Sequence, residues 1–372
     1  MKALRKAAFI KVGSFSHINI NVFKELARNF PEFHFDIIDL MPDNYGSKIA
    51  PAVFNCLKEY GSEIIFGKKT LKATIDRTYY VFNKRRKFIL NNLARKKYDF
   101  TFQTQSMFDA SIPGIPHFLY TDHTHLENLH YPGFDRRLLL NTHWVDCETS
   151  IYQNAIINFT MSSNISKSII EDYSCSPEKV ICVYCGSNVK VTDNESFDAN
   201  RFSKKNILFV GLDWKRKGGP VLVEAFKSVL AAYPDATLTI VGCRPSIDLP
   251  NCSVLGKVDL AEVKNFFNQA SVFCLPTTLE PFGIVFLEAM AHKLPAVATR
   301  IGAIPDFIHD GGNGYLVDPD NSKQLSDALI KLLDSETKCR TFGEYGYELF
   351  QDRYTWEKTG LRIREKIMPF IG

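Results

Sequence analysis

The sequence has no long apolar segment, no pattern of paired cysteines and little excess of charge of either sign. No apolar run approaches the roughly 20 residues that a membrane-spanning helix needs, and the first 15 residues lack the apolar core of a signal peptide. The net charge is only +4 and no recognised nucleic-acid-binding motif is present, which argues against a DNA- or RNA-binding protein. With 45% hydrophobic and 23% charged residues, the composition is that of a globular chain.

The nine cysteines have no spacing typical of a disulfide framework. Several lie inside strand-like runs, where a thiol serves as a small buried hydrophobic group. Cys182 and Cys185 form a single C-x-x-C pair, without a second pair or a histidine pattern that would complete a zinc site. We therefore expect free thiols in a reducing compartment, and a cytoplasmic location.

The chain is too long for one ordinary core and suits two domains of roughly 150 to 200 residues each. Strand, helix and turn signals alternate throughout, which predicts parallel α/β layers. In the first half we expect a helix over 20–30 and strands over 7–13, 33–40 and 115–121. A second alternating series runs from 207 to about 333, and residues 354–367 have the pattern of an amphipathic helix.

Residues 280–288 combine two carboxylates with a turn signal and a helix signal. Pro281 and Gly283 disfavour a helix at the start, whereas 284–291 is mostly apolar and compatible with one. The preceding run, 270–276, is typical of a buried strand that ends at a proline. The sequence thus predicts a strand, a short loop and then a helix.

That order places Glu280 just past the carboxyl end of a strand and Glu288 about one and a half turns into the next helix. In an open parallel sheet, ligands bind at this edge. The start of the helix also offers unpaired backbone N–H groups to a polar or anionic ligand. Two solvated surface glutamates are the alternative interpretation.

The spacing from Glu280 to Glu288 resembles the E-x7-E signature of the family 4 retaining glycosyltransferases, which have the GT-B fold. Residues 206–219 resemble the first strand of that family's C-terminal domain and the phosphate-binding loop that follows it. Residues 236–242 and 254–257 resemble its second and third strands, and 298–320 resembles the segment that closes the donor site. The resemblance extends from about residue 160 to 350 and is weak in the first 110 residues.

The resemblance implies an α/β protein with two Rossmann-like domains facing across a cleft. The N-terminal, acceptor-binding domain would span 1–187 and be completed by 351–372, whose helix crosses back to it. The nucleotide-sugar-binding domain would span 188–350.

The resemblance also implies roles for residues that would bind the nucleotide-sugar donor, which we call the donor side. Lys217 matches the family's phosphate-binding lysine, six residues after Gly211. The arginine that usually follows this glycine is replaced by Leu212, and we expect Arg216 to supply the missing guanidinium. A basic turn that merely begins a helix is the alternative.

The acidic motif and its neighbours would hold the rest of the donor. Glu280 would lie near the sugar hydroxyls and anomeric carbon, and Glu288 would bind the ribose hydroxyls. The resemblance implies that the main chain of Phe282 and Gly283 contacts the donor sugar, and that of Ile284 or Val285 the phosphates. Main-chain groups of Val254, Gly256 and Lys257 would contact the base.

The acceptor side is expected in the loop at 120–125, after a strand-like run. Family members often carry a functional histidine there, near the C6 hydroxyl of the donor sugar. His123 matches best by spacing, with Asp122 and His125 as alternatives. These three residues together with His130 could ligate a metal ion, but the spacing lacks a metal signature and we expect none. The first loop, with Gly13 and Ser14, corresponds to a region near the donor phosphates and the acceptor but lacks the usual paired glycines.

Residues 68–97 contain eleven lysines and arginines and a single acidic residue. The apolar side chains Tyr79, Phe82, Ile89 and Leu93 fall on one helical face. Such a stretch could contact an anionic membrane that presents a lipid-linked acceptor, or steer an anionic acceptor. It could equally be an ordinary helix whose apolar face belongs to the core.

The sequence therefore predicts a retaining hexosyltransferase that needs neither a metal nor another cofactor. It would move a sugar from a UDP, GDP or ADP sugar, which the sequence does not distinguish, to a hydroxyl of a glycan or lipid-linked acceptor. A nucleotide-sugar epimerase of the same fold and a non-catalytic nucleotide-sugar-binding partner subunit are the alternatives. A glycoside hydrolase is disfavoured because the phosphate-binding loop would have no purpose.

Overall fold

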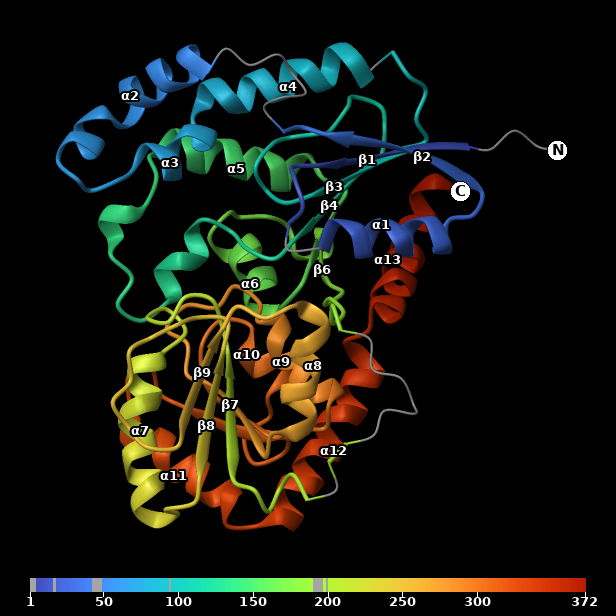
Figure 1. Ribbon diagram of the computed structural model, residues 1–372. Helices are drawn as coiled ribbons and strands as arrows, with labels where there is room; N and C mark the ends of the chain where they lie inside the picture. The colour runs from blue at the N-terminus through green and yellow to red at the C-terminus, as the bar shows by residue number, and fades with distance from the viewer. Residues whose placement is uncertain (1–4, 16–17, 42–48, 94, 190–196, 199) are drawn as a thin grey trace. The chain divides into compact units, whose positions relative to one another are not determined.

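The computed structural model describes residues 5–15, 18–41, 49–93, 95–189, 197–198 and 200–372 (Figure 1). The chain divides into two compact units: Met1–Tyr184 with Thr359–Gly372, and Cys185–Lys358. The sequence analysis predicted that the second domain spans 188–350. The second unit of the structure extends a few residues beyond this range at both ends. We call the two parts unit 1 and unit 2.

Unit 1 is built on six parallel strands in the order β2-β1-β3-β4-β5-β6. The strands are β1 (Arg5–Lys11), β2 (Phe33–Asp39), β3 (Phe100–Thr104), β4 (His117–Thr121), β5 (Ile157–Thr160) and β6 (Val180–Cys182). The helices are α1 (Ile18–Asn29), α2 (Ile49–Ile65), α3 (Leu71–Thr74), η2 (Ile75–Arg77), α4 (Tyr79–Leu93), η3 (Leu126–His130), η4 (Arg136–Leu138), α5 (Thr142–Asn154), α6 (Ser163–Glu171), η5 (Pro177–Lys179) and part of α13 (Trp356–Ile371). The strands expected near 7–13, 33–40 and 115–121 and the helix near 20–30 are confirmed.

The central strands of unit 1 are buried on both faces because helices cover both sides of the sheet. Every residue of β3, β4 and β5 is buried. A row of stacked phenylalanine rings crosses from strand to strand, with centroids 6.2 to 6.3 Å apart between Phe9, Phe102, Phe159 and Phe118. These rings hold the sheet rigid behind the loops at its carboxyl edge.

The last helix, α13, returns to unit 1 as expected. Arg364 Nη1 lies 2.8 Å from a carboxylate oxygen of Glu32, and the rings of Phe370 and Phe118 are 6.1 Å apart. Arg5 Nη2 donates to the carbonyl of Ile371 at 2.6 Å. The helix crossing back to the N-terminal domain is therefore confirmed.

Unit 2 is a second sheet of six parallel strands in the order β12-β11-β10-β7-β8-β9. The strands are β7 (Asn206–Val210), β8 (Thr237–Val241), β9 (Cys252–Gly256), β10 (Val272–Leu275), β11 (Ala296–Thr299) and β12 (Gly314–Val317). The helices are α7 (Gly219–Ala232), α8 (Leu260–Gln269), α9 (Ile284–Ala291), α10 (Ile304–Phe307), α11 (Ser322–Leu333) and α12 (Glu336–Arg353). Figure 1 shows α7 and α11 on one side of the strands and α8, α9 and α12 on the other.

Each sheet has one point where the winding reverses. In unit 2 the chain moves outward from β7 to β9 and then crosses to β10, which pairs with β7 on its other side. In unit 1 the equivalent point lies between β1 and β3. At such a point the loops leave in opposite directions and open a crevice at the carboxyl edge, where ligands bind. The fold alone therefore marks one candidate site in each unit.

The basic stretch at 68–97 folds as the ordinary-helix interpretation expected. Phe82, Ile89 and Leu93 of α4 are buried, and Arg85 is also fully buried, where it contacts Asp76 at 3.0 Å. Of the predicted apolar face, Tyr79 alone is exposed. In the described part of the chain, no helix is both long and apolar enough to cross a bilayer.

Candidate active site

The switch point of unit 2 brings together the loops after β7 and β10. Lys217 from the first loop forms an ion pair with Glu280 from the second, and both side chains are almost fully buried. Arg216 Nη1 donates to the carbonyl of Leu279 at 2.7 Å. The structure therefore brings together three residues that the sequence assigned to the donor side.

Close packing of the two loops requires a glycine. Gly218 has a φ of 76°, and a Cβ at this position would lie 1.8 Å from the carbonyl oxygen of Pro276. Any other residue would push the loop away from the end of β10. The carbonyl of Arg216 is fixed by Thr278, whose backbone N–H donates at 2.9 Å. The loop is thus positioned before any ligand arrives.

Glu288 lies in α9, one turn beyond the glycine that begins the helix. Its side chain is buried, and it forms no hydrogen bond or ion pair with the residues that the structure describes. Burial raises the pKa of Glu288 to about 8. A buried carboxyl group without a partner is costly in a protein that has no ligand to bind there. This cost marks Glu288 as a ligand-binding candidate.

The remaining donor-side residues lie at the same carboxyl edge. Phe282 is buried and Gly283, with a φ of 94°, is the cap of α9, so Ile284 and Val285 occupy its first turn. Gly211 follows β7 directly. Its N–H donates to the carbonyl of Val241 at 2.9 Å, and the N–H of Gly242 donates to the carbonyl of Gly256 at 2.7 Å. Val254 belongs to β9, and Lys257 follows it as an exposed residue.

Arg244 is a donor-side cation that the sequence analysis missed. Its Nε lies 2.2 Å from the place where a Cβ of Gly256 would stand, so the guanidinium packs against the backbone at the end of β9. Arg244 lies two residues after the strand-like run 236–242. Because ligands bind at the carboxyl ends of strands, this position could have identified Arg244 as a candidate. Leu212, which replaces the expected arginine, is 70% exposed.

The switch point of unit 1 holds a cavity of about 110 Å³. It is lined by residues from the loops after β1, β3 and β4, from η2 and from α5: Phe15, Arg77, Gln105, Ser106, Met107, Thr121, Asp122, His123, His125, Trp144 and Glu148. All three acceptor-side candidates of the 120–125 loop therefore share one cavity.

Unsatisfied polar atoms gather around this cavity. Within the described chain, no partner is found for four buried atoms of its lining: Gln105 Oε1, His123 Nδ1, His125 Nδ1 and Trp144 Nε1. His123 Nε2 accepts from Asn128 at 3.0 Å, and His125 Nε2 accepts from the backbone N–H of Leu140 at 2.8 Å. Both rings consequently carry their proton on Nδ1 and keep an unused donor. Buried polar atoms are rarely left unpaired unless a ligand or water pairs with them.

Burial sets the charge of these groups. It lowers the pKa of His123 to about 4 and of His125 to about 3, and in both cases the nearby Arg77 guanidinium adds to the effect. Burial raises the pKa of Asp122 to about 6. At neutral pH both rings are therefore neutral hydrogen-bond donors.

Arg77 is the second residue that the sequence analysis did not place in a site. Its guanidinium lies 5.8 Å from the centre of the Trp144 ring and forms no ion pair with any described residue. The carboxylate of Glu148 is instead held by the backbone N–H of His125 at 3.1 Å and by the Tyr152 hydroxyl at 2.9 Å. No sequence signal separates Arg77 from the other basic residues around it, because its position depends on how η2 packs on α5.

The first loop is described only in part, since residues 16–17 lie outside the described residues. The carbonyl of Gly13 accepts from Asn19 at 2.8 Å, and its N–H donates to Asp39 at 3.0 Å. Ser14 is exposed, and the next residue, Phe15, lines the cavity.

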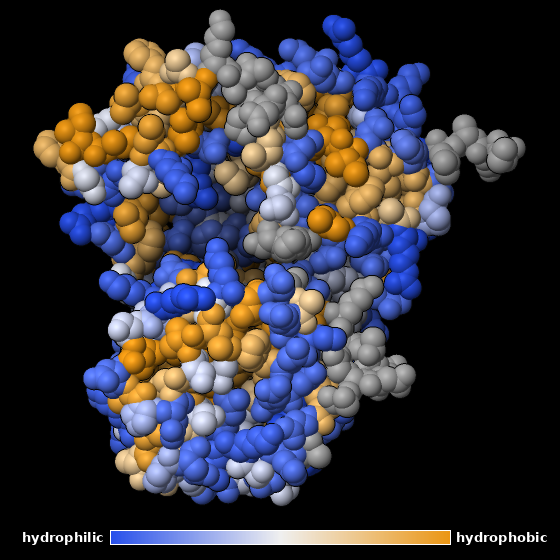
Figure 2. Space-filling model, viewed as in Figure 1, coloured by the Kyte–Doolittle hydropathy of each residue, from blue (hydrophilic) through white to orange (hydrophobic). Residues whose placement is uncertain are grey.

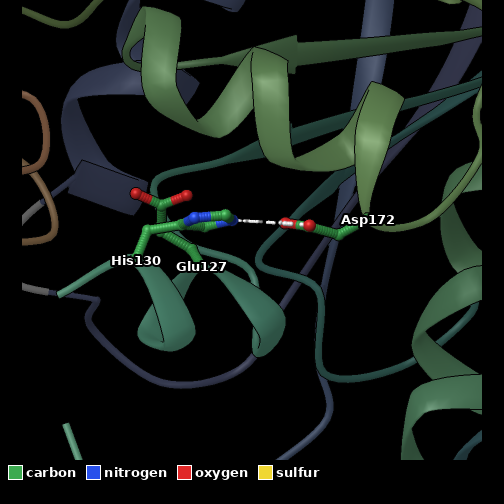
Figure 3. Close-up of side chains that lie close together, drawn as sticks. All are labelled: Glu127, His130 and Asp172. Atoms are coloured by element: carbon green, nitrogen blue, oxygen red, sulfur yellow. Dashed lines mark hydrogen bonds and ion pairs between the residues drawn. The ribbon is translucent and has the colours of Figure 1, made fainter.

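His130 lies apart from the other histidines. Its Nε2 is 3.1 Å from Asp172, and Glu127 completes a group whose potential metal-ligand atoms lie within 4.8 Å of one another (Figure 3). The acids already have partners in the protein, because Ser168 donates to Asp172 at 2.7 Å and Asn164 to Glu127 at 2.7 Å. We therefore interpret this group as a polar contact that joins η3 to α6.

All nine cysteines are free.

Comparison with known proteins agrees with the geometry of unit 2. Residues 192–349 match the family model of glycosyl transferases group 1. A protein of Methanocaldococcus jannaschii that is named an uncharacterized glycosyltransferase is 31% identical over 192 residues, which cover 50% of this chain and 53% of that protein. The chain thus spans about half the length of the curated relatives that it matches.

Solved structures cover the whole chain. Sucrose-phosphate synthase from Thermosynechococcus elongatus has a TM-score of 0.70 at 16% identity over 98% of both chains. Anabaena HepE, solved in complex with UDP and glucose, has a TM-score of 0.62 at 15% identity and covers 98% of this chain and 99% of its own. This likeness shows the fold. The chain has the GT-B fold, and its segment 192–349 resembles the group 1 glycosyl transferases.

Proposed function

We propose that the protein is a retaining, metal-independent glycosyltransferase that moves a hexose from a nucleotide-diphosphate sugar to an acceptor hydroxyl. The observation that carries this proposal is the ion pair of Lys217 and Glu280 at the switch point of unit 2, followed in α9 by Glu288, whose buried side chain pairs with none of the described residues. The match of residues 192–349 to group 1 glycosyl transferases supports it. The nucleotide complexes of HepE support UDP as the first nucleotide to test.

Lys217 would hold the diphosphate as it leaves with the negative charge of the broken glycosidic bond. When the donor binds, the phosphate oxygens compete with Glu280 for the ammonium group, and the Glu280 carboxylate can then accept from sugar hydroxyls. Arg216 lies one residue away and adds a second cation. Preorganised charge of this kind stabilises the transition state more than the ground state, because the diphosphate charge develops as the bond breaks.

Glu288 would bind the ribose diol. Because the pKa of Glu288 is raised to about 8, its carboxyl group is mostly protonated at neutral pH in the free protein. Hydrogen bonds from the two ribose hydroxyls would favour the ionised form, which can accept both, and so lower this pKa when the donor binds. The N–H groups of Phe282 and Gly283 would contact the sugar, and those of Ile284 or Val285 in the first turn of α9 would contact the phosphates. Main-chain groups near Val254, Gly256 and Lys257 would hold the base, with Arg244 packed beside them.

The cavity of unit 1 would receive the acceptor. Its unused Nδ1 donors on His123 and His125 suit hydroxyl oxygens, and the unpaired acceptor Gln105 Oε1 suits a hydroxyl proton. Arg77 forms no ion pair with a described residue, although Glu148 lines the same cavity, so we expect the acceptor to carry a phosphate or a carboxylate. Membrane presentation of a lipid-linked acceptor by residues 68–97 also remains a proposal.

The test is a panel of UDP, GDP and ADP sugars. A donor that raises the melting temperature identifies the nucleotide, because a ligand that binds the native state stabilises it. The same donor is then incubated with and without a cell extract, with and without a chelator. Transfer with unchanged anomeric configuration and no chelator effect supports the proposal. An isomeric nucleotide sugar formed without any acceptor indicates an epimerase, and binding without turnover indicates a non-catalytic subunit.

A further inference from the structure

Exposed apolar side chains are concentrated in one part of unit 1. Of the fifteen large apolar side chains that are exposed in the described chain, eight lie between residues 41 and 79: Met41, Ile49, Phe54, Leu57, Ile65, Phe66, Leu71 and Tyr79. Figure 2 shows hydrophobic residues gathered over α2, at the upper left of the view. Scattered single residues of this kind are normal on protein surfaces, whereas a contiguous group marks an interaction site.

The helix α2 presents its apolar side chains outward. Phe54, Leu57 and Ile65 fall on one face at helical spacing and are 68%, 47% and 80% exposed. Cys56 and Tyr60, on the opposite face, are fully buried. The helix is therefore anchored to unit 1 by one side, and a second apolar side is left exposed by the residues that the structure describes.

Cations surround this face. A hollow of about 800 Å³ between α2, α4 and the start of α5 is lined by Lys58, Lys84 and Lys87. Its single lining acid is Glu59, whose carboxylate accepts from the backbone N–H of Tyr79 at 3.1 Å and 3.3 Å. Lys68 and Lys72 are exposed just beyond α2.

The charge is strongly asymmetric along the chain. Residues 49–97 contain eight lysines and four arginines against two glutamates and one aspartate, a net charge of +9. Because the whole chain carries +4, all the other residues together carry −5. Part of this charge is paired inside the protein, because Lys69 and Arg85 are buried against Glu63 and Asp76. The exposed Lys58, Lys68, Lys72 and Lys87 form no ion pair with a described residue, so an apolar and anionic partner suits this face.

We propose that this face docks the protein on an anionic lipid bilayer. The α2 surface, defined as Phe54, Leu57, Ile65 and Phe66 with Lys58, Lys68, Lys72 and Lys87, would place its apolar side chains at the boundary between head groups and acyl chains. The lysines would contact lipid phosphates. A second copy of the chain fits less well, because a two-fold contact through this face would set the same lysines against each other. The proposal does not depend on sugar transfer.

The test is co-sedimentation of the full chain with vesicles. Vesicles of equimolar phosphatidylglycerol and phosphatidylcholine should bind the protein, and vesicles of phosphatidylcholine alone should bind it at least about tenfold more weakly. High salt should weaken the binding, because charge screening removes the attraction of the lysines.

Variants separate the two contributions. Phe54→Ser with Ile65→Ser should weaken binding at least about tenfold, since each removes an apolar side chain from the bilayer. Lys58→Glu with Lys87→Glu should abolish the preference for the anionic vesicles. Leu361→Ser, at a position that is 50% exposed on α13, is the matched control and should bind like the wild type. Thermal unfolding verifies that each variant is folded, as the exposure of these side chains predicts.

Two outcomes would overturn the proposal. One is a wild-type chain that does not bind the anionic vesicles, or whose Phe54/Ile65 variant binds them as well as the Leu361 control. The other is a concentration-dependent dimer in gel filtration that the Phe54/Ile65 variant abolishes while vesicle binding is absent. The second result would assign this face to self-association. Neither result bears on donor binding in unit 2, so failure here is distinguishable from failure of the proposed glycosyltransferase activity.

Discussion

The two candidate sites lie at equivalent positions of two similar sheets, yet they hold charge in different ways. In unit 2, Lys217 and Glu280 already form an ion pair, and Glu288 is a buried acid that pairs with none of the described residues. In unit 1, His123 and His125 are neutral and keep unused N–H donors, and Arg77 supplies the cation. The first arrangement combines a cation that can bind phosphate with carboxyl groups that can accept from hydroxyl groups. The second suits a ligand rich in hydroxyl groups with one charged substituent.

The difference also concerns how each site is assembled. The candidate site of unit 2 is formed mainly by two loops that follow neighbouring strands, and each loop carries its candidate residues within a short run. The cavity of unit 1 takes side chains from five separate parts of the chain. Substitutions should therefore separate the two sites cleanly, with donor binding lost in one group and acceptor use in the other.

The largest effect is expected for Lys217→Ala. Loss of the diphosphate-binding cation should lower kcat/KM for the donor by about 10² to 10³, the usual effect of removing one charge-stabilising group. Steady-state kinetics with the identified donor provide the measurement. Lys227→Ala removes an exposed lysine that pairs with Glu224 on α7 and should leave the kinetics unchanged. If the Lys217 and Lys227 variants had the same kcat/KM for the donor, Lys217 would not be part of the donor site.

The next largest effect is expected for Arg77→Gln. An anionic acceptor should lose about tenfold to a hundredfold in kcat/KM, because a hydrogen bond to a charged group contributes about 1.5 to 3 kcal/mol. Binding of the nucleoside diphosphate, measured by calorimetry, should not change. Arg137→Gln changes an exposed arginine that pairs with Asp135 and serves as the control. A loss of nucleotide affinity in the Arg77 variant would contradict the division of labour between the units.

A smaller effect with a characteristic pH dependence is expected for Glu288→Gln. The native pKa of Glu288 is about 8, above the ordinary value of 4.5, so the native state retains a proton that the unfolded state releases between these pH values. The stability contributed by this group is full below about pH 4.5 and is lost as pH rises to 8. The neutral Gln variant should be the more stable protein at pH 8, by about 1 to 3 kcal/mol.

The measurement is chemical denaturation of both proteins at several pH values. The same variant should bind the donor more weakly, because an ionised carboxylate is the better acceptor for the ribose diol. A Gln variant that is less stable than the wild type at pH 8 would show that Glu288 has a charged partner in the native protein.

The smallest effect is expected for Arg244→Ala. The side chain is exposed, and its contribution to nucleotide binding is therefore screened by solvent. We expect about a twofold to fivefold weaker affinity for the nucleoside diphosphate, measured by calorimetry. Arg300→Ala removes a similarly exposed arginine that pairs with Asp310 and should have no effect. If Arg244→Ala weakened nucleotide affinity more than Lys217→Ala, the main cation for the phosphates would be Arg244, after β8, and not Lys217, after β7.

The meeting of the loops at the switch point of unit 2 could be predicted largely from the sequence, because these loops follow strands directly. Lys217 and Glu280 meet since β7 and β10 are neighbours, and the alternation of strands and helices implies that neighbourhood. The return of α13 to unit 1 followed in the same way from its amphipathic pattern and the resemblance to GT-B proteins.

The rest depends on packing that no local pattern reveals. Arg77 belongs to a run of basic residues and reaches the cavity only because η2 packs near Trp144 of α5. The apolar pattern of α4 was visible, but its face is part of the core. The exposed face of α2 was not recognised, because the sequence analysis assigned no helix to residues 49–65. Distant contacts decide which apolar face meets solvent.

The central claim is that a nucleoside diphosphate binds at the switch point of unit 2 and not in unit 1. Calorimetric titration of the full chain with UDP, GDP and ADP tests it most directly, with the Lys217→Ala and Arg77→Gln variants alongside. We predict that one of these nucleotides binds, that the Lys217 variant weakens its affinity at least about tenfold, and that the Arg77 variant leaves it unchanged. Unchanged affinity in the Lys217 variant, or a loss confined to the Arg77 variant, would contradict the account.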